Sequence, residues 1–380
     1  MNKFYAVTSH DPFAIAPPLS EKLKAKRSYR PVEGLEEACN VAMLLGTPLL
    51  LTGEPGTGKT RAAHWLADKL KIRLLIANVK SASTAKDLLY SFDEIARFRD
   101  SQQAGTKKPL VQYLQFQPLG AAILRAAGGK TVLFDQNNDE ELDRATILRR
   151  PDILEAVLGE TGLCHPELGL TVDDLLPKAV RPDYSDPHHV VVLIDELDKA
   201  ARDTPNDLLT EIDDMAFRID ELGLTIRSSK AKRPIVIMTN NSEKSLPEPF
   251  LRRCCFFHIP FPKGPGELAK IVTANLGGED GAAEDSLNDQ QVSVLARIFY
   301  ELRDEAGLQK KPATSEFLAW AGVVGSDPLL KGFTTEDDLG SDHECRKRFV
   351  STLSVLAKSK GDRDRSLEQL RRLAPKESDD

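Results

Sequence analysis

The chain has 380 residues, of which 41% are hydrophobic and 29% are charged, and its formal net charge is -7. This length allows two or three domains, the balance is that of a soluble globular protein, and the acidic charge argues against a surface built mainly to bind nucleic acid. Apolar runs stay well short of the roughly 20 residues that cross a bilayer, and the N-terminus lacks a signal-peptide pattern. We therefore expect a cytoplasmic protein that enters no membrane.

Five scattered cysteines are typical of free thiols in a reducing compartment. Cys254 and Cys255 raise the alternative of a metal site, but adjacent cysteines lack C-x-x-C spacing and His258 is the only nearby histidine. We predict buried thiols at a strand edge. The full set is Cys39, Cys164, Cys254, Cys255 and Cys345.

The chain opens with proline-punctuated residues of mixed charge, and we predict an N-terminal arm over residues 1–30. From Pro31, apolar residues at helical spacing predict a helix over 32–45 that ends at Gly46. The apolar run at 48–52 predicts the first strand.

The next stretch is GEPGTGKT, which fits G-x-x-x-x-G-K-[ST] at every fixed position. It lies between a predicted strand and a predicted helix, as a phosphate-binding loop requires. Its glycines let several N–H groups turn toward one anion, Lys59 adds a cation, and Thr60 offers a hydroxyl to Mg²⁺. The alternative is a glycine-rich turn without a ligand. The candidate nucleotide-binding residues are Gly53, Glu54, Pro55, Gly56, Thr57, Gly58, Lys59, Thr60 and Arg61.

Four further elements precede the next motif. Aliphatic residues predict a second strand at 72–79, and a helix opens at 83–90 and runs past Phe98. Residues 110–116 alternate between polar and apolar, as in a surface hairpin arm. Residues 135–189 are acidic and rich in prolines, so we predict an insertion of short helices and loops.

The apolar run at 190–194 predicts a strand buried on both faces, and it ends in Asp195 and Glu196. Ligands bind at the carboxyl ends of parallel strands, so both carboxylates should face the phosphate loop. Asp195 can hold Mg²⁺ through its water shell, and Glu196 can orient and deprotonate an attacking water. The alternative is that this acidic pair only caps the following helix.

A third apolar strand at 234–241 ends in Asn240 and Asn241, and an amide there could bind the attacking water or the γ-phosphate. Beyond it, Arg252 and Arg253 end a short helix. They could be solvated surface groups, or one could reach a neighbouring subunit's phosphate as an arginine finger.

The remaining chain is predicted to be helical, with helices at 267–276, 289–306, 315–323 and 344–358. Four such helices form a lid-sized domain. Residues 361–380 are rich in charge and are predicted to be a fraying tail.

Together these motifs resemble those of AAA+ ATPases, and within that class the MoxR-like branch, over residues 31–358. The resemblance implies an α/β fold, with a P-loop NTPase three-layer αβα core and parallel sheet at 31–265 and a small all-helical lid domain at 266–360. The stretches that carry it are GEPGTGKT, FQPLGAAI at 116–123, VVLIDELDKA at 191–200, PNDLLTEID at 205–213 and IVIMTNNSEKSLPEPFLRRC at 235–254.

The resemblance also implies roles for single residues. Lys59 and Thr60 match the Walker A pair, and Asp195 and Glu196 match the Walker B pair. For sensor 1 we favour Asn241 over Asn240, because its distance to Leu246 is the usual one. Arg253 matches the arginine finger, with Arg252 as the fallback.

The sensor-2 position departs from the family. Relatives often carry an arginine near the start of the third lid helix, whereas residues 309–316 contain none. Lys310 or Lys311 could supply the charge, although a lysine lacks the planar fork of an arginine.

The resemblance implies a Mg²⁺-dependent ATPase that forms a homo-oligomeric ring, in our expectation a hexamer, with a neighbour's arginine completing each site. MoxR-like ATPases are associated with von Willebrand factor A domain proteins and act as chaperones, so we expect remodelling or maturation of a protein partner. One alternative is a DNA-directed motor or defence-complex ATPase, which the acidic charge disfavours. Another is a nucleotide-gated scaffold with little turnover, which the intact Asp195–Glu196 pair disfavours.

Overall fold

The computed structural model describes residues 29–102, 108–159, 169–228, 230–241, 246–276, 287–304, 307–330, 332–335, 338 and 343–373. The chain divides into two compact units. The α/β unit comprises Glu33–Thr52 and Lys59–His258, and the helical unit comprises Met1–Val32, Gly53–Gly58 and Ile259–Asp380. We had expected the boundary near residue 265, and the predicted arm falls almost wholly outside the described residues.

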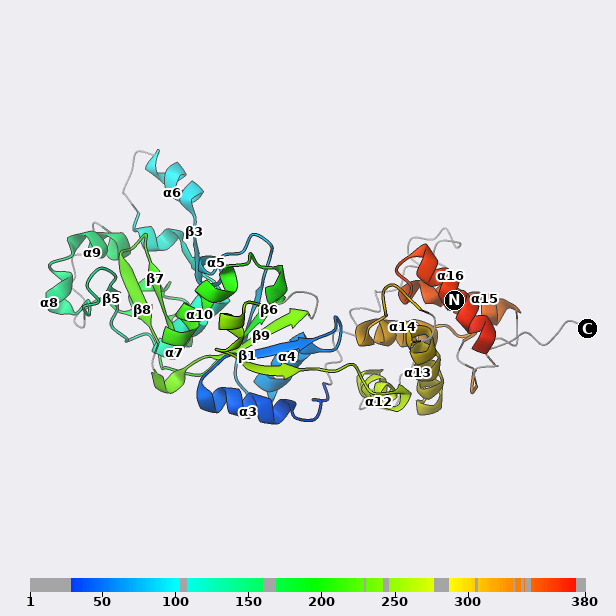
Figure 1. Ribbon diagram of the computed structural model, residues 1–380. Coiled ribbons are helices and arrows are strands. Elements are labelled where there is room, and N and C mark those ends of the chain that lie inside the picture. The colour runs from blue at the N-terminus through cyan, green and yellow to red at the C-terminus, as the bar shows by residue number, and fades with distance from the viewer. Residues whose placement is uncertain are drawn as a thin grey trace, which may run out of the picture. The chain divides into compact units, whose positions relative to one another are not determined.

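The α/β unit is built on a five-stranded sheet with the strand order β10-β1-β9-β6-β2 (Figure 1). β1 runs parallel to β10, β2 to β6, and β6 to β9. The aliphatic residues of β6 are all buried, so helices cover both faces of the sheet. This confirms the three-layer fold. The strands are β1 (Leu49–Gly53), β2 (Leu74–Asn78), β6 (Val191–Asp195), β9 (Ile235–Asn241) and β10 (Cys255–His258).

The register of these strands brings their polar ends together. Asn78 pairs with Asp195, and Ile194 pairs with Met238, so Asp195 ends beside Thr239. Because the strands are parallel, this is also the edge at which β1 passes into the phosphate loop.

Three helices pack on this sheet. α3 (Leu35–Leu45) contacts β10 and ends at Gly46, which has a left-handed φ of 67°. α4 (Lys59–Leu70) contacts β2, β6 and β9, and α7 (Pro118–Ala127) contacts β2 and β6. The helices predicted before and after the phosphate loop are therefore present.

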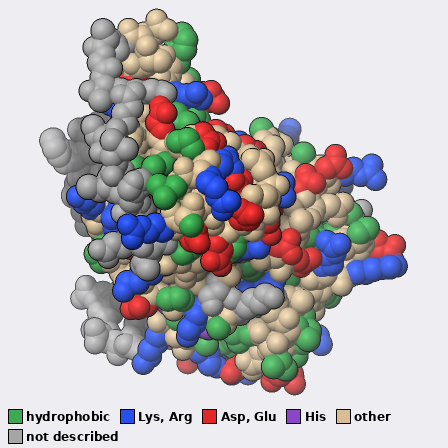
Figure 2. Space-filling view, turned by 90° about the vertical axis from the view of Figure 1, so that its left-hand side faces the viewer, with side chains coloured by type: hydrophobic (Ala, Val, Ile, Leu, Met, Phe, Trp, Pro, Cys, Tyr) green, Lys and Arg blue, Asp and Glu red, His purple; other side chains and the backbone are tan. Residues whose placement is uncertain are grey.

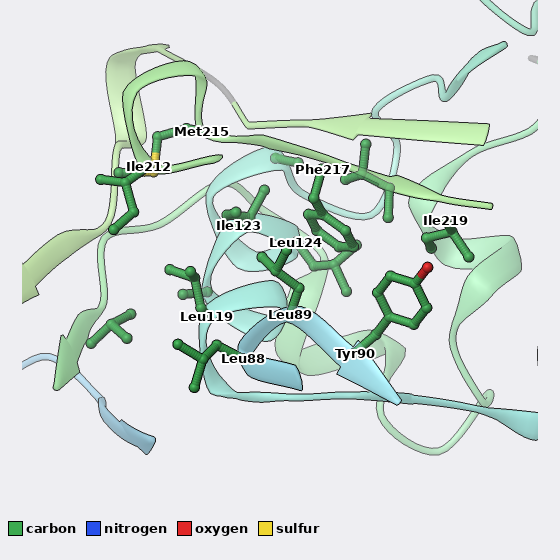
Figure 3. Packing of buried hydrophobic residues seen from close by; sticks show 14 of the residues in the cluster. Leu88, Leu89, Tyr90, Leu119, Ile123, Leu124, Ile212, Met215, Phe217 and Ile219 are labelled. Carbon is green, nitrogen blue, oxygen red and sulfur yellow. The ribbon is translucent and has the colours of Figure 1, made fainter. Parts of the chain in front are cut away.

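A small antiparallel sheet with the order β5-β8-β7 packs against α7 through β8, and the sequence had not predicted it. Its strands are β5 (Phe134–Asp135), β7 (Ala216–Ile219) and β8 (Leu224–Arg227), and Gly223 in the β7–β8 turn has a φ of 71°. Helix α10 (Thr204–Asp214) leads into β7. Figure 3 shows the shared core, in which Leu119, Ile123 and Leu124 of α7 lie with Leu88, Leu89, Tyr90, Ile212, Met215, Phe217 and Ile219.

The single helix predicted from residue 83 past Phe98 is wrong. The chain forms α5 (Lys86–Leu89), β3 (Tyr90–Phe92) and α6 (Glu94–Ser101). The strand β3 interrupts the helix because it pairs antiparallel with β4 (Leu114–Phe116). The Tyr90 ring of β3 also stacks on Phe217 at a centroid distance of 6.2 Å. The predicted hairpin arm is thus β4 with a short 3-10 turn at Leu110–Tyr113.

The segment predicted as an insertion at 135–189 does contain short helices, α8 (Arg144–Ile147) and α9 (Pro151–Leu158), with 3-10 turns at Val172–Leu175 and Arg181–Tyr184. Ile147 and Ile153 bury their side chains in the core of the α/β unit.

On the face that Figure 2 shows, acidic and basic side chains are interspersed among the atoms that are not grey.

The helical unit has its own core, which includes Phe299, Phe317, Trp320 and Phe349. The prediction of a fraying tail from residue 361 is wrong for the residues up to Leu373, which belong to helix α16. Leu370 of this helix is buried, and the Asp362 carboxylate accepts a hydrogen bond from the Gln309 N–H at 2.8 Å. Among the described residues, the helices lack the length and apolarity that a membrane crossing requires. The helices are α12 (Pro265–Leu276), α13 (Asp289–Asp304), α14 (Thr314–Ser326), α15 (His343–Thr352) and α16 (Lys360–Leu373).

Candidate functional site

Four polar residues of the α/β unit meet at the carboxyl edge of its sheet, where β6 and β9 end and α4 begins. The Thr60 hydroxyl lies 3.1 and 3.0 Å from the two carboxylate oxygens of Asp195. The Thr239 hydroxyl donates to Asp195 Oδ1 at 2.6 Å and accepts from the Glu196 N–H at 2.9 Å. Thr239 therefore connects the two acidic residues.

The oxygens of this cluster fit a magnesium ion. Mg²⁺ takes oxygen ligands and is usually held by one or two protein groups together with water and phosphate oxygens. The Thr60 hydroxyl and the Asp195 carboxylate offer such oxygens side by side. Within the described part of the chain, no cluster of three or more His, Cys, Asp or Glu is arranged to hold a metal. Phosphate and water would have to complete the coordination.

The phosphate loop has the backbone that its glycines predict. Gly53 has a φ of 147°, and a Cβ there would clash with the carbonyl oxygen of Ile259. The Thr57 hydroxyl donates to the Glu54 carbonyl at 2.9 Å and closes the turn. Lys59 is 7% exposed and begins α4, so its charge lies at the start of that helix. This combination favours an anion at the loop.

Glu196 adopts a strained backbone. Its φ of 61° and ψ of 47° are left-handed, which is uncommon for a residue with a side chain. The bond from its N–H to Thr239 holds this conformation. Its half-exposed carboxylate pairs with Lys199, three residues later. A base that must meet a water molecule needs such access to solvent.

The structure separates the two asparagines. Asn240 is buried, at 5% exposure. Asn241 lies on the same face of β9 as Thr239, because side chains alternate along a strand. Its Nδ2 and backbone N lie 3.5 and 3.3 Å from the Asp198 carboxylate, in the turn after Glu196. Asn241 is therefore the asparagine on the face of the acidic cluster.

Sequence reasoning missed Thr239. The residue precedes the asparagine pair and lies two positions before Asn241, so the alternation of a strand would have placed both on one face. A hydroxyl side chain at the end of an apolar strand was the sequence feature that could have identified Thr239.

Both candidate finger arginines are exposed and pair with acids of the α/β unit. They follow α11 (Glu248–Leu251), and Arg252 pairs with Glu248 on the preceding turn. The guanidinium of Arg253 lies 3.5 Å from the Asp213 carboxylate, with both side chains about half exposed. A neighbouring molecule could reach either arginine.

Cys254 and Cys255 lie at the start of an edge strand, as predicted, but they are partly rather than fully buried. Cys255 of the edge strand β10 has its Sγ 3.2 Å from Thr47 Oγ1, and burial raises the pKa of the Cys254 thiol to about 12. Among the described cysteines, these two, Cys39 and Cys345 are free thiols, and Cys164 lies outside the described residues.

Lys311, a lysine proposed for sensor 2, pairs with an acid of α13. Lys311 is exposed and lies 3.4 Å from the Asp304 carboxylate. An arginine that the sequence did not single out, Arg303 of α13, instead donates to Glu54 of the phosphate loop.

Residues 45–134, from the end of α3 to β5, match the family model described as an AAA domain. This stretch of the chain is similar to AAA domains. In addition, 61 residues, 16% of the chain, are 34% identical to midasin of Dictyostelium discoideum, and this match covers 1% of midasin's own length. This match spans only a short segment of a much longer protein.

Two solved structures of RuvB from Thermotoga maritima are also similar to the chain. One is a variant, with a TM-score of 0.38 at 14% identity over 90% of this chain and 67% of its own. The other, described as a Holliday junction branch migration motor, has a TM-score of 0.37 at 14% identity over 93% of this chain and 69% of its own. With scores this low, the similarity to AAA domains rests on the match of residues 45–134.

Proposed function

We propose that the chain binds ATP with Mg²⁺ and hydrolyses it. The observation that carries this proposal is the direct contact between the Thr60 hydroxyl and the Asp195 carboxylate, at 3.0–3.1 Å, where the phosphate loop enters α4. These two residues would hold the metal, which supplies charge stabilisation to the phosphate oxygens when bound. The N–H groups of Gly53–Gly58 and the charge of Lys59 would hold the β- and γ-phosphates.

The residues around this contact suit attack by water. Glu196 would take a proton from the water whose oxygen bonds to the γ-phosphorus, while the bond from that phosphorus to the β-phosphate oxygen breaks. The products are ADP and inorganic phosphate. Thr239 fixes the backbone of Glu196 by accepting its N–H, and Asn241 would orient the water from the same strand face.

The complete site would include an arginine from a second copy of the chain in a ring, which we propose is a hexamer. Arg253 is the candidate, with Arg252 as the fallback, because both side chains are exposed and an arginine can neutralise charge in phosphoryl transfer.

The resemblance of the motifs to the MoxR-like branch supports the finer proposal that hydrolysis remodels or matures a protein partner, one with a von Willebrand factor A domain. The Glu196→Gln variant should hold such a partner in the presence of ATP and release it when ATP is removed. A partner that binds equally well without nucleotide would contradict this role.

Nucleotide titration tests the binding step. Lys59→Ala should weaken MgATP binding at least about tenfold, because it removes a charge that would contact the phosphates. Chelation of Mg²⁺ should weaken the binding of ATP to the wild-type chain as well. Equal dissociation constants for Lys59→Ala and wild type would overturn the assignment of the phosphate loop.

A further inference from the structure

Arg303 is a buried charge in the last turn of α13. Its side chain is only 5% exposed. A guanidinium stays protonated in proteins, so its burial is costly unless its N–H groups find acceptors. The identity of those acceptors therefore shows what the residue holds in place.

Three groups of the helical unit surround this guanidinium. It donates to the Glu54 carboxylate and to the carbonyl oxygen of Pro312. Its central carbon lies 3.7 Å from the centroid of the Phe261 ring, a cation–π contact. The planar fork can satisfy an acid and a carbonyl at once, which the point charge of a lysine does less well.

The acid in this set belongs to the phosphate loop. Glu54 follows Gly53, and its carbonyl oxygen accepts from both the hydroxyl of Thr57 at 2.9 Å and the N–H of Thr57 at 3.4 Å. A change in the position of Glu54 therefore changes the turn whose N–H groups would face the phosphates.

The other acceptor of Arg303 begins a segment that packs against the same loop. A Cβ on Gly56 would lie 2.7 Å from Ala313 Cβ and 2.5 Å from Ser315 Oγ, so the backbone of the loop and the start of α14 are in close contact. Arg303 thus donates hydrogen bonds both to Glu54 of the loop and to Pro312, which precedes the segment that contacts Gly56.

We propose that Arg303 is a positioning residue for the phosphate loop, acting through Glu54, so that α13 sets the affinity of the loop for nucleotide. The inference rests on the proposed binding of ATP and identifies a residue that tunes it. Arg303 takes no part in the chemical step. Its loss should therefore act on the binding of nucleotide and leave turnover at saturation nearly intact.

The test is a double-mutant cycle on the full chain, read by the dissociation constant of MgATP and by KM and kcat. Arg303→Ala and Glu54→Ala should each weaken MgATP binding about tenfold, since each breaks a charged hydrogen bond that fixes the loop. The double variant should be no weaker than either single variant. KM for ATP should rise while kcat stays within about twofold of wild type.

Arg348→Ala is the matched control. Arg348 is also a buried arginine of the helical unit, and it pairs with Asp327 at 3.1 Å on elements that do not include the loop. This control should lower the melting temperature but leave the dissociation constant of MgATP within about twofold of wild type. Arg303→Lys serves if the alanine variant fails to fold, and it should raise the dissociation constant by less than Arg303→Ala would.

Two results would overturn the inference. One is a folded Arg303 variant that binds MgATP as tightly as wild type, and the other is a double variant whose loss equals the sum of the two single losses. Failure of the wild-type chain to bind MgATP would instead overturn the proposed function, and the first titration in the series detects it.

Discussion

Thr239 is the residue on which the geometry of both acids depends. Thr239→Val keeps the shape of the side chain but removes the bonds to Asp195 and to the Glu196 N–H. Because the base then loses its backbone support, kcat for ATP should fall about tenfold or more, while the dissociation constant of MgATP changes far less. Steady-state kinetics with a separate binding titration measure the two effects.

Thr225→Val is the matched control for this prediction. Thr225 is another buried strand threonine of the α/β unit, at 6% exposure on β8, away from the acidic cluster. Its replacement should leave kcat near that of wild type. An unchanged kcat in Thr239→Val would show that the hydroxyl does not position Glu196.

The residues of the candidate site differ in how far the sequence could predict them. Local motifs contain Thr60, Asp195 and Glu196, and the residue types in these motifs already indicate metal binding and base catalysis. The structure places the three residues together. Arg303 and Glu54 are joined only through the packing of α13 near the loop, so no local pattern could connect them.

Helices and strands were predictable to the degree that their signals are local. β6 and β9 are continuous apolar runs with polar ends, and they were predicted. β3 and β7 have three and four residues, too few for a clear period, and they form because a partner strand accepts their hydrogen bonds. α16 was not predicted because most of its residues are charged and few of its buried positions are apolar, so the sequence shows no clear helical period.

Helix α10 should give the α/β unit a pH-dependent stability. Burial, and then the nearby Asp214, raises the pKa of the half-buried Glu211 from 4.5 to about 6. A carboxyl whose pKa is raised by folding favours the folded state when protonated, so its contribution to stability falls as the pH rises from about 4.5 through 6.

Glu211→Gln should therefore raise the melting temperature at pH 7.5 and change it little near pH 4.5. Solvent screening limits the gain to about 1 kcal/mol or less, or about 2–4 °C. Thermal unfolding at both pH values measures it. Glu368→Gln, an exposed residue paired with Arg372 on α16, is the control and should show no such difference. A lower melting temperature for Glu211→Gln at pH 7.5 would contradict the argument.

At the scale of the whole molecule, the account predicts sites that two subunits share. Arg253→Ala subunits keep their own Lys59 but lack the finger, and Lys59→Ala subunits keep the finger but bind nucleotide poorly. Mixing the two inactive variants should restore part of the ATP hydrolysis, because a Lys59→Ala subunit can offer its arginine to an intact loop. Phosphate release across a range of mixing ratios measures the recovery.

Mixtures of Arg252→Ala with Lys59→Ala subunits identify which arginine acts. Recovery at no ratio with either arginine variant would contradict a finger acting between subunits. If Arg252→Ala alone behaves as an inactive partner that can be rescued, the fallback residue takes the role instead of Arg253.

The central proposal is that this chain hydrolyses ATP with Glu196 as the base, and phosphate release by Glu196→Gln tests it most directly. The account predicts that the variant binds MgATP within about threefold of wild type and releases phosphate at least about a hundredfold more slowly, since general-base catalysis contributes about 10²–10⁴-fold. Hydrolysis by Glu196→Gln at the wild-type rate, with binding retained, would contradict it.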